Sequence, residues 1–336
     1  MPETQCLEKE TVVTEQKEFC FRPITLETKE LIESYTKPWA MDCSDLSFAN
    51  LFIWGAEGKM QFAEKDNVLF IKLDFANVPV FFWAPIPKKG ETVQYKKAIQ
   101  DAIAYMEQIG VEPTFRSVWV PFRDKMLEAC PNLHVMPTDI AWDYVYERES
   151  LATLKGKKLH GKRNHINKFL AMHPDYEYRQ LDASMIDECI GLYEKWISER
   201  EDTAELEDER KSVALALRNM ERLGLTGGAI YVDGKLSAFT VGERLREDMQ
   251  LIHIEKADTE IDGLYPMINQ QYVLHECQEV TYINREEDMG HAGMRKAKRS
   301  YYPAYMVEKY LLSVHDLTDA KGLWKQRESD DNTVNR

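Results

Sequence analysis

The same order of predicted elements runs twice through this chain of 336 residues. In each half, a helical pattern precedes β-branched and aromatic segments separated by polar turns, and a second helical pattern and a further strand follow. The length allows two domains of ordinary size. We therefore expect an α+β protein with two similar domains, residues 1–150 and residues 151–336.

Apolar spacing and turn signals define the individual elements. Apolar residues at i, i+3, i+4 and i+7 predict the helix that starts near Ile99. Asp233-Gly234, between two β-rich segments, is a strong hairpin signal. The predicted helices are 24–35, 99–109, 186–197, 213–220, 264–277 and 290–300, and the predicted strands are 59–63, 68–75, 78–83, 114–121, 229–232, 235–244, 249–255 and 279–284.

The composition is that of a water-soluble globular protein, with 44% hydrophobic and 30% charged residues. No apolar run reaches the ~18 residues of a membrane-spanning helix, and the first residues contain no apolar core of a signal peptide. The six cysteines are scattered, without a CxxC pair. We therefore expect reduced thiols in the cytoplasm and no metal site.

Residues 155–168 carry six Lys or Arg and no acid, in a chain of net charge −14. Without these six cations the chain would carry about −20, so the stretch is a focused basic site in an acidic protein. It suits a multiply charged anion such as the phosphates of a nucleotide, a tRNA end or a lipid head group. The alternative is a connector with a solvated basic face. The predicted binding residues of this stretch are Lys158, Arg163, Asn164 and Lys168.

A second charged segment, residues 284–303, joins a strand end to three acids, a turn with glycines and a cationic helix. Carboxylates at a strand end facing cations suit a site that deprotonates an amine and holds an anion. The alternative is that the acids only offset the dipole of the helix that follows. We predict Glu286 and Asp288 as proton acceptors and Asn284 as an oxyanion donor. The predicted substrate-binding residues of this segment are Arg285, Arg295, Lys296 and Lys298.

A third segment, residues 45–54, contains Asp45 and Asn50 among apolar residues. These two side chains can line a cleft between the domains, although a core segment with Asp45 as a helix cap is the simpler interpretation. His253 lies within a predicted strand and is interpreted as a core histidine.

Three segments, residues 45–54, 154–169 and 284–298, together resemble signatures of one bacterial family. This uncharacterised family is allied to the C-terminal domain of phosphatidylglycerol lysyltransferase, and the resemblance extends over about residues 20–315. It is similar in plan to the Fem peptidoglycan aminoacyltransferases. The resemblance implies two tandem domains of the acyl-CoA N-acyltransferase (GNAT) type, with mixed, mostly antiparallel sheets flanked by helices. The second domain would begin with a basic connecting helix at about 155–172.

The resemblance also implies an activity, which is transfer of an aminoacyl or acyl group to an amine or hydroxyl. The expected donor is an aminoacyl-tRNA as co-substrate, with no bound cofactor. The expected acceptor is a small molecule or a lipid head group, and peripheral contact with a membrane is compatible with it. One alternative is an acyl-CoA-dependent N-acyltransferase, but residues 255–266 hold one glycine and several acids that would repel a pyrophosphate. The other is a non-catalytic module that binds tRNA or another polyanion.

Overall fold

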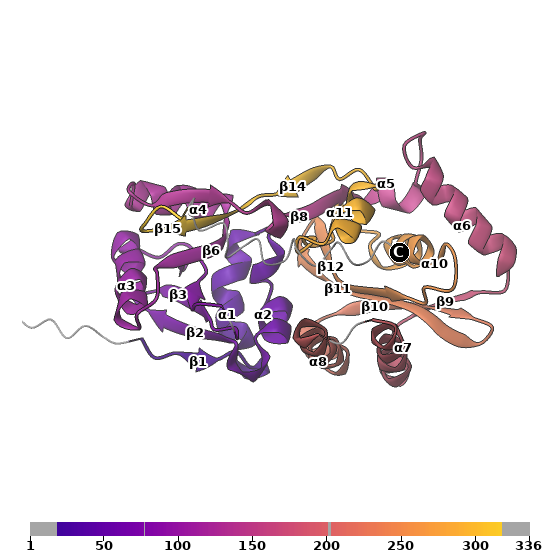
Figure 1. The fold of residues 1–336 in the computed structure, drawn as a ribbon, viewed down its shortest axis with the longest axis horizontal. Helices are drawn as coiled ribbons and strands as arrows, with labels where there is room; N and C mark the ends of the chain where they lie inside the picture. Colours follow the sequence, from indigo (N-terminus) through magenta and orange to yellow (C-terminus); the bar gives the residue numbers. More distant parts are fainter. Residues whose placement is uncertain (1–18, 77, 201–202, 318–336) are drawn as a thin grey trace, which may run out of the picture.

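The computed structural model describes residues 19–317, except residues 77 and 201–202. The molecule is elongated, and its two sheets follow one another along the long axis (Figure 1). Within the described residues, one sheet has eight strands and the other has seven. The expected α+β class with mixed sheets and flanking helices is confirmed.

The first sheet has the order β1-β2-β3-β4-β6-β15-β7, and β5 pairs with β3. Its neighbouring strands are antiparallel except for β4 and β6, which are parallel. The strands are β1 (Arg22–Pro23), β2 (Met60–Lys65), β3 (Val68–Leu73), β4 (Phe81–Phe82), β5 (Ile86–Pro87), β6 (Thr114–Trp119), β7 (His134–Pro137) and β15 (Lys309–Ser313).

The second sheet, read from its opposite edge, has the order β9-β10-β11-β12-β13-β8-β14. Its neighbours are antiparallel except for β12 and β13, so the sequence of strand directions repeats that of the first sheet. The strands are β8 (Asp143–Glu147), β9 (Glu177–Gln180), β10 (Thr226–Val232), β11 (Lys235–Arg246), β12 (Met249–Ala257), β13 (Tyr282–Asn284) and β14 (Tyr305–Val307).

The sixth strand of each sheet comes from the other part of the chain. β8 precedes the predicted boundary at residue 150 but lies in the second sheet, whereas β15 comes near the C-terminal end and lies in the first sheet. The sheets therefore do not divide the chain at residue 150. The reason is that strand pairing is decided by tertiary contacts that local periodicity does not encode.

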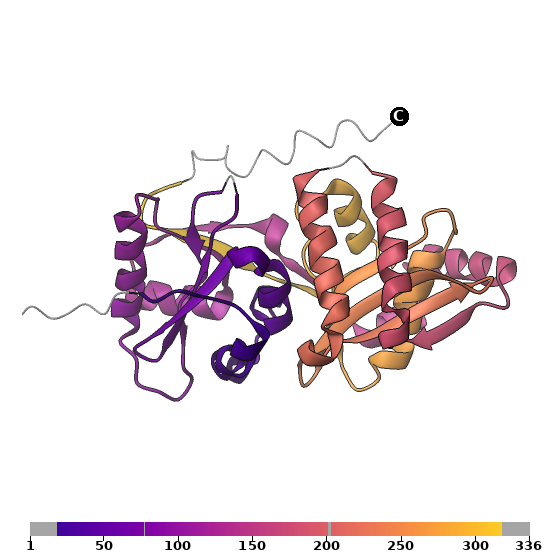
Figure 2. The ribbon, with the colours of Figure 1, turned by 90° about the horizontal axis from the view of Figure 1, so that it is seen from below.

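Helices cover both sheets, and α2 packs against α8 where the two halves meet. Figure 2 shows α7 and α8 side by side on the second sheet, while α10 packs on its other face. The α-helices are α1 (Lys29–Thr36), α2 (Phe48–Trp54), α3 (Tyr95–Gln108), α4 (Val120–Ala129), α5 (Arg148–Thr153), α6 (His160–Met172), α7 (Ile186–Ser198), α8 (Ala204–Arg218), α9 (Met220–Leu223), α10 (Leu264–Glu276) and α11 (Ala292–Arg299). The 3-10 helices are η1 (Leu26–Thr28), η2 (Lys37–Trp39), η3 (Ser44–Leu46), η4 (Ala56–Gly58), η5 (Asp139–Ala141) and η6 (Ala183–Met185).

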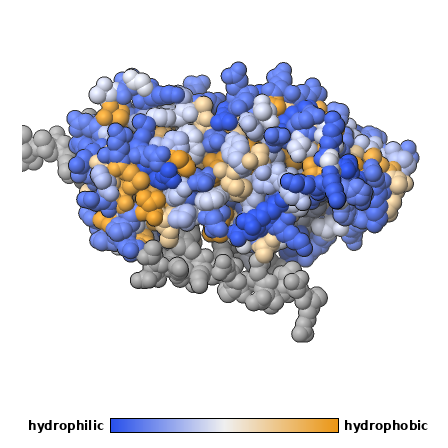
Figure 3. All heavy atoms as spheres, turned by 90° about the horizontal axis from the view of Figure 1, so that it is seen from above, coloured by the Kyte–Doolittle hydropathy of each residue, from blue (hydrophilic) through white to orange (hydrophobic). Residues whose placement is uncertain are grey.

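The hydrophobic core is continuous between the halves. One cluster of buried side chains includes the first sheet and the face of the second sheet under α7 and α8. A separate cluster fills the other face of the second sheet, under α5, α6 and α10. On the face seen in Figure 3, hydrophobic side chains form scattered patches among hydrophilic ones, because most apolar surface is packed inside these clusters.

Most predicted elements are present, with shifted ends. The hairpin at Asp233-Gly234 joins β10 to β11 as predicted. The strand predicted to reach Pro121 stops at Trp119, because proline suits the first turn of a helix and α4 begins there. Among the described helices, none has the length and apolar content that crossing a bilayer requires.

The basic helix α6 is not a connector between the halves. Figure 1 places it at the end of the molecule farthest from the first sheet. Its apolar residues Ile166 and Phe169, together with Leu159 just before it, are buried in the cluster under α10. Gly263 allows this close packing, because a Cβ there would lie 2.3 Å from the carbonyl oxygen of His165.

Candidate functional site

The parallel strands β12 and β13 separate at the centre of the second sheet. They pair over three residues, and the last pair is Leu251 and Asn284. Beyond this pair β12 continues to Ala257, whereas β13 ends and the residues after it no longer pair with β12. Glu286 adopts a left-handed backbone conformation with φ of 57°. Such a conformation costs free energy in a residue other than glycine and is found mostly where the surroundings hold it in place, often at functional sites.

Side chains bridge the gap that the two strands leave. The Oε1 atom of Glu286 accepts hydrogen bonds from Nδ2 of Asn50 at 2.9 Å and from Nδ1 of His253 at 3.0 Å. The Nε2 atom of His253 lies 3.1 Å from Oε1 of Glu243. Because Asn50 belongs to α2, this network joins the two halves of the molecule.

His253 is held between two carboxylates and is 3% exposed. A ring nitrogen that faces a carboxylate must carry a proton to form a hydrogen bond, so both nitrogens act as donors. Burial lowers the pKa of His253, but the hydrogen bonds to Glu243 and Glu286 and their charges outweigh burial and raise it to about 9. His253 is therefore a buried histidine with both ring nitrogens hydrogen-bonded, which agrees with the expected core position, and it is an imidazolium at neutral pH.

Glu287 lies beside this network with its side chain 29% exposed. Burial raises the pKa of Glu287 to about 7, the nearby charges of Asp45 and Glu286 act in the same direction, and Lys309 opposes them. A carboxyl group that titrates near neutral pH is well suited to accept a proton during a reaction. Among the three acids of this segment, Glu287 was not one that the sequence led us to predict as a site residue.

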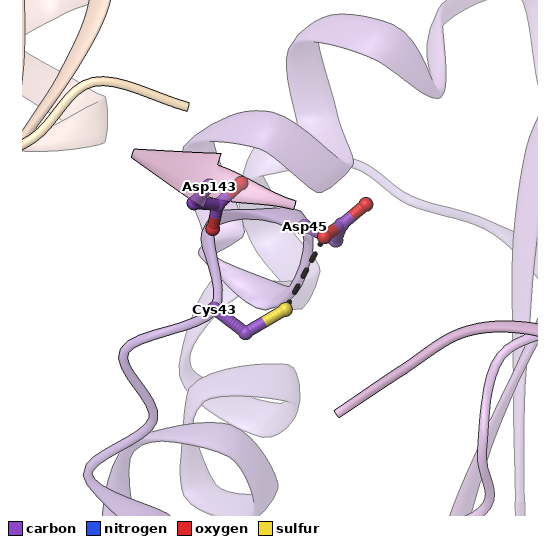
Figure 4. Close-up of side chains that lie close together, drawn as sticks. All are labelled: Cys43, Asp45 and Asp143. Atoms are coloured by element: carbon purple, nitrogen blue, oxygen red, sulfur yellow. Dashed lines mark hydrogen bonds between the residues drawn. The ribbon is translucent and has the colours of Figure 1, made fainter. Parts of the chain in front are cut away.

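Next to Glu287, the ligand atoms of Cys43, Asp45 and Asp143 lie within 4.8 Å of one another (Figure 4). This spacing suits a metal ion, but the ammonium of the buried Lys309 makes ion pairs with both carboxylates, at 2.7 Å from Oδ1 of Asp143. Ser44 donates to Asp143 from its backbone nitrogen and its hydroxyl. The cluster therefore compensates a buried lysine.

Asn284 is fully buried, and all its side-chain hydrogen-bonding groups are used. Its Nδ2 donates to the carbonyl oxygen of Asp42 at 2.8 Å and to Oδ2 of Asp143 at 3.1 Å, and its Oδ1 accepts from the backbone nitrogen of Glu286 at 2.7 Å. These contacts do not support the predicted role as an oxyanion donor. A buried amide must satisfy its own groups, and Asn284 does so by holding Glu286 in its unusual conformation.

Asp288 and Arg295 form a structural pair before and within α11. Asp288 is 1% exposed and accepts hydrogen bonds from Nε of Arg295 at 2.9 Å and from the hydroxyl of Tyr144 at 2.6 Å. Burial raises the pKa of Asp288, but these hydrogen bonds outweigh it and lower the pKa. The mutual pairing gives both side chains a structural role, and the predicted roles of Asp288 as a proton acceptor and of Arg295 as a phosphate ligand stay predictions.

Lys298 binds the backbone of the site segment. Its Nζ donates to the carbonyl oxygens of Arg285 at 2.6 Å, Glu286 at 3.2 Å and Glu287 at 2.5 Å. It therefore positions the carboxylates and is not free for the phosphate that we predicted. Lys296, on the same helix, is exposed at the surface.

Most of the basic stretch is also committed to local contacts. Arg163 donates to the carbonyl oxygens of Leu154 and Gly156 and closes the loop before α6. Asn164 contacts His160 one turn earlier at 3.2 Å. The Nη1 atom of Arg163 thus satisfies carbonyl oxygens at the end of α5 and in the loop that follows, and its phosphate role stays a prediction.

Two other predicted cations of this stretch are exposed. Lys168 pairs with Asp262 at 2.6 Å, and Lys158 lies 5.2 Å from the ring of Tyr302. Neither reaches the network around Glu286, because α6 lies at the outer end of the second half (Figure 1). The basic stretch instead approaches the far end of the second charged segment, where Lys158 faces the ring of Tyr302 and Lys162 faces that of Tyr301.

The sequence did not point to Glu243, Glu287 and Lys309 as members of the site, nor to the charged form of His253. Asp45 and Asn50 had been named as cleft residues, and their segment does meet the second half. The cap of α2 is Ser47, not Asp45. Lys309 gave no signal in the sequence, since a single lysine after a strand is ordinary.

The mixed sheets, the separating parallel pair and the carboxylates at the gap define the class as a GNAT-like α+β fold. The family follows from the sequence. Residues 38–313 match the family described as phosphatidylglycerol lysyltransferase, C-terminal, and the chain belongs to this family, as its motifs predicted.

The chain is also similar to solved and curated proteins. A conserved protein of unknown function from Bacteroides thetaiotaomicron VPI-5482 is 35% identical, with 89% of this chain and 100% of that chain covered and a TM-score of 0.79. L-PGS from Bacillus licheniformis shares the fold at 13% identity, with 89% and 96% covered and a TM-score of 0.62. An uncharacterized protein of Mycoplasmoides gallisepticum is 28% identical over 178 residues, which are 51% of this chain and 56% of that protein.

Proposed function

We propose that the protein transfers an aminoacyl group from an aminoacyl-tRNA to an amine or hydroxyl acceptor. Its family and its GNAT-like fold support a transferase of acyl or aminoacyl groups in general. The observation that carries the proposal is the pair of carboxylates, Glu286 and Glu287, held in the gap where β13 leaves β12.

In the proposed reaction, the acceptor nitrogen or oxygen attacks the ester carbonyl of the donor. A new bond forms to the carbonyl carbon, and the bond to the ribose oxygen breaks. Glu287 takes the proton from the acceptor and returns it to the leaving ribose hydroxyl, which its pKa of about 7 favours. Glu286, fixed by Asn50 and His253, orients the reacting groups.

The charge of the site supports an aminoacyl donor. Around the gap lie the five carboxylates of Glu243, Glu286, Glu287, Asp45 and Asp143, whereas the cations beside them are His253, Lys298 and Lys309. The surplus of negative charge suits a group with a positive charge, such as the ammonium of an aminoacyl ester.

An acyl-CoA donor has less support. In GNAT-like enzymes, a pyrophosphate binds best where backbone N–H groups begin a helix. Here the residues before α10 include Asp262, which is paired with Lys168 and His165, and Asp258, which is paired with Lys195. A pyrophosphate at this position would have to displace carboxylates from their partners.

The test is transfer of a radiolabelled amino acid from bulk charged tRNA to a panel of amines, peptides and phosphatidylglycerol vesicles. We expect transfer by the wild type and a loss of 100-fold or more in Glu287→Gln and in Glu286→Gln. Glu221→Gln, at an exposed glutamate of α9, is the matched control. Normal turnover in Glu287→Gln would refute its role as base.

The other outcomes of the same assay distinguish the alternatives. Transfer that needs acetyl-CoA or another acyl-CoA and ignores charged tRNA would establish the acyl-CoA enzyme. Binding of tRNA by the wild type without transfer to any acceptor would favour a non-catalytic module.

A further inference from the structure

Lys162 differs from the other cations of α6 because it points to a buried aromatic ring. Its Nζ lies 4.0 Å from the ring centroid of Tyr301. Across the described residues, no carboxylate or carbonyl oxygen forms a hydrogen bond or ion pair with this ammonium, whereas Arg163 and Lys168 on the same helix both have such partners. An ammonium that has lost part of its water and gained no anion is costly.

A second cation faces the same ring. The guanidinium of Arg285 lies 5.0 Å from the centroid of Tyr301, and its Nη2 donates to Oε1 of Glu255 at 2.8 Å. Its Nη1 is buried without a hydrogen-bond partner, and the guanidinium also interacts with the hydroxyl of Tyr301. Burial lowers the pKa of Lys162 to about 8, and the charge of Arg285 acts in the same direction.

One carboxylate balances these two cations. Glu255 is 12% exposed, and its second oxygen already accepts a hydrogen bond from Nδ2 of Asn269 at 2.9 Å. The neighbourhood of Tyr301 therefore has one uncompensated positive charge, unused N–H donors on two side chains and an aromatic wall. These properties fit a compact anion with several acceptor oxygens.

We propose that Lys162, Arg285 and Tyr301 form a phosphate-binding subsite for the donor. The phosphate would lie between the ammonium of Lys162 and the free edge of Arg285. Arg285 directly precedes Glu286, so the subsite is next to the gap in which transfer is proposed. The assignment to the donor rests on the proposed function, and the phosphate comes either from the backbone of a nucleic acid or from CoA.

The experiment measures equilibrium binding without turnover, so that it is independent of the transfer assay. Inorganic pyrophosphate, CoA and bulk charged tRNA are each titrated against the wild type, Lys162→Gln and Lys235→Gln over a salt series. Lys235, the exposed first residue of β11, is the matched control for the lost charge. We expect Lys162→Gln to weaken binding about 10-fold and to reduce the salt slope for tRNA by about 1.

A second measurement uses the wild type alone, in case Lys162→Gln disturbs α6. The amine of Lys162 is labelled with an amine-reactive ester at pH 8, and the modified peptide is quantified by mass spectrometry. A bound phosphate raises the proton affinity of the amine and covers it, so labelling at Lys162 should fall several-fold while labelling at Lys235 stays constant.

The outcomes separate the sources and can overturn the subsite. Protection by CoA but not by charged tRNA assigns the phosphate to CoA, and the reverse assigns it to the nucleic acid. Equal affinities of the wild type and Lys162→Gln, or unchanged labelling in the presence of all three probes, would overturn the proposal. Binding at Lys162 without transfer activity would leave the subsite standing and remove the proposed function.

Discussion

At the residue scale, the charged state of His253 is the main consequence of the site. Its pKa is about 9 in the folded protein, against an ordinary value of 6.5. The hydrogen bonds of the His253 imidazolium to Glu243 and Glu286 therefore contribute their full stabilisation below about pH 6.5. This contribution to the unfolding free energy, on the order of 3 kcal/mol, is lost as the pH rises through about 9. We predict that the difference in unfolding free energy between the wild type and His253→Gln shrinks between pH 6 and pH 9.5.

The same property has a direct readout. The imidazole signals of His253 should titrate near pH 9 in an NMR experiment, and the exposed His134 allows His134→Gln as the control for stability. A titration of His253 at or below its ordinary value would show that the two carboxylates do not hold it as an imidazolium.

At the element scale, α11 anchors the segment that carries the carboxylates. Lys298 donates to three successive carbonyl oxygens, from Arg285 to Glu287. We predict that Lys298→Met lowers the unfolding free energy by about 1–3 kcal/mol, because those buried acceptors lose their donor. Urea denaturation measures the change, and Lys296→Met, at an exposed position of the same helix, should stay within about 0.5 kcal/mol of the wild type. Equal effects of the two substitutions would contradict this anchoring role.

At the scale of the whole molecule, the exchanged strands β8 and β15 make each sheet depend on the other part of the chain. Asp143, at the start of β8, and Lys309, at the start of β15, form a buried ion pair where the strands cross between the halves. We predict that Asp143→Asn destabilises both halves together by about 3–5 kcal/mol, since it leaves a buried ammonium without full compensation.

Denaturation followed by far-ultraviolet circular dichroism and by fluorescence of single-tryptophan variants checks this prediction. Variants that retain only Trp119, in the first sheet, or only Trp196, on α7, report on the two halves separately. Coincident transitions, both shifted by Asp143→Asn, are expected. Two separate transitions, of which only one moves, would mean that the halves unfold independently.

The sequence was sufficient where the physical signal is local. Helical spacing located α3, a turn dipeptide located the β10–β11 hairpin, and the motif around Glu286 located the end of β13. Charge density drew attention to α6, but it could not tell which cation lacks a partner. Partners such as Asp262 for Lys168 lie far away in the chain, so a count of charges overestimated the number of cations without an ion-pair partner.

By itself, the sequence determined the family, the α+β class and the acidic segment that follows β13, because motifs, periodicity and turn chemistry are properties of neighbouring residues. Only the tertiary structure decided that β8 and β15 exchange sheets and that Asn50 and His253 meet Glu286. It also decided that Glu287 acquires a pKa near neutrality. The reason is that long-range packing decides which strands pair, while burial and charges distant in the sequence decide the pKa of a side chain. No single segment of the sequence contains this information.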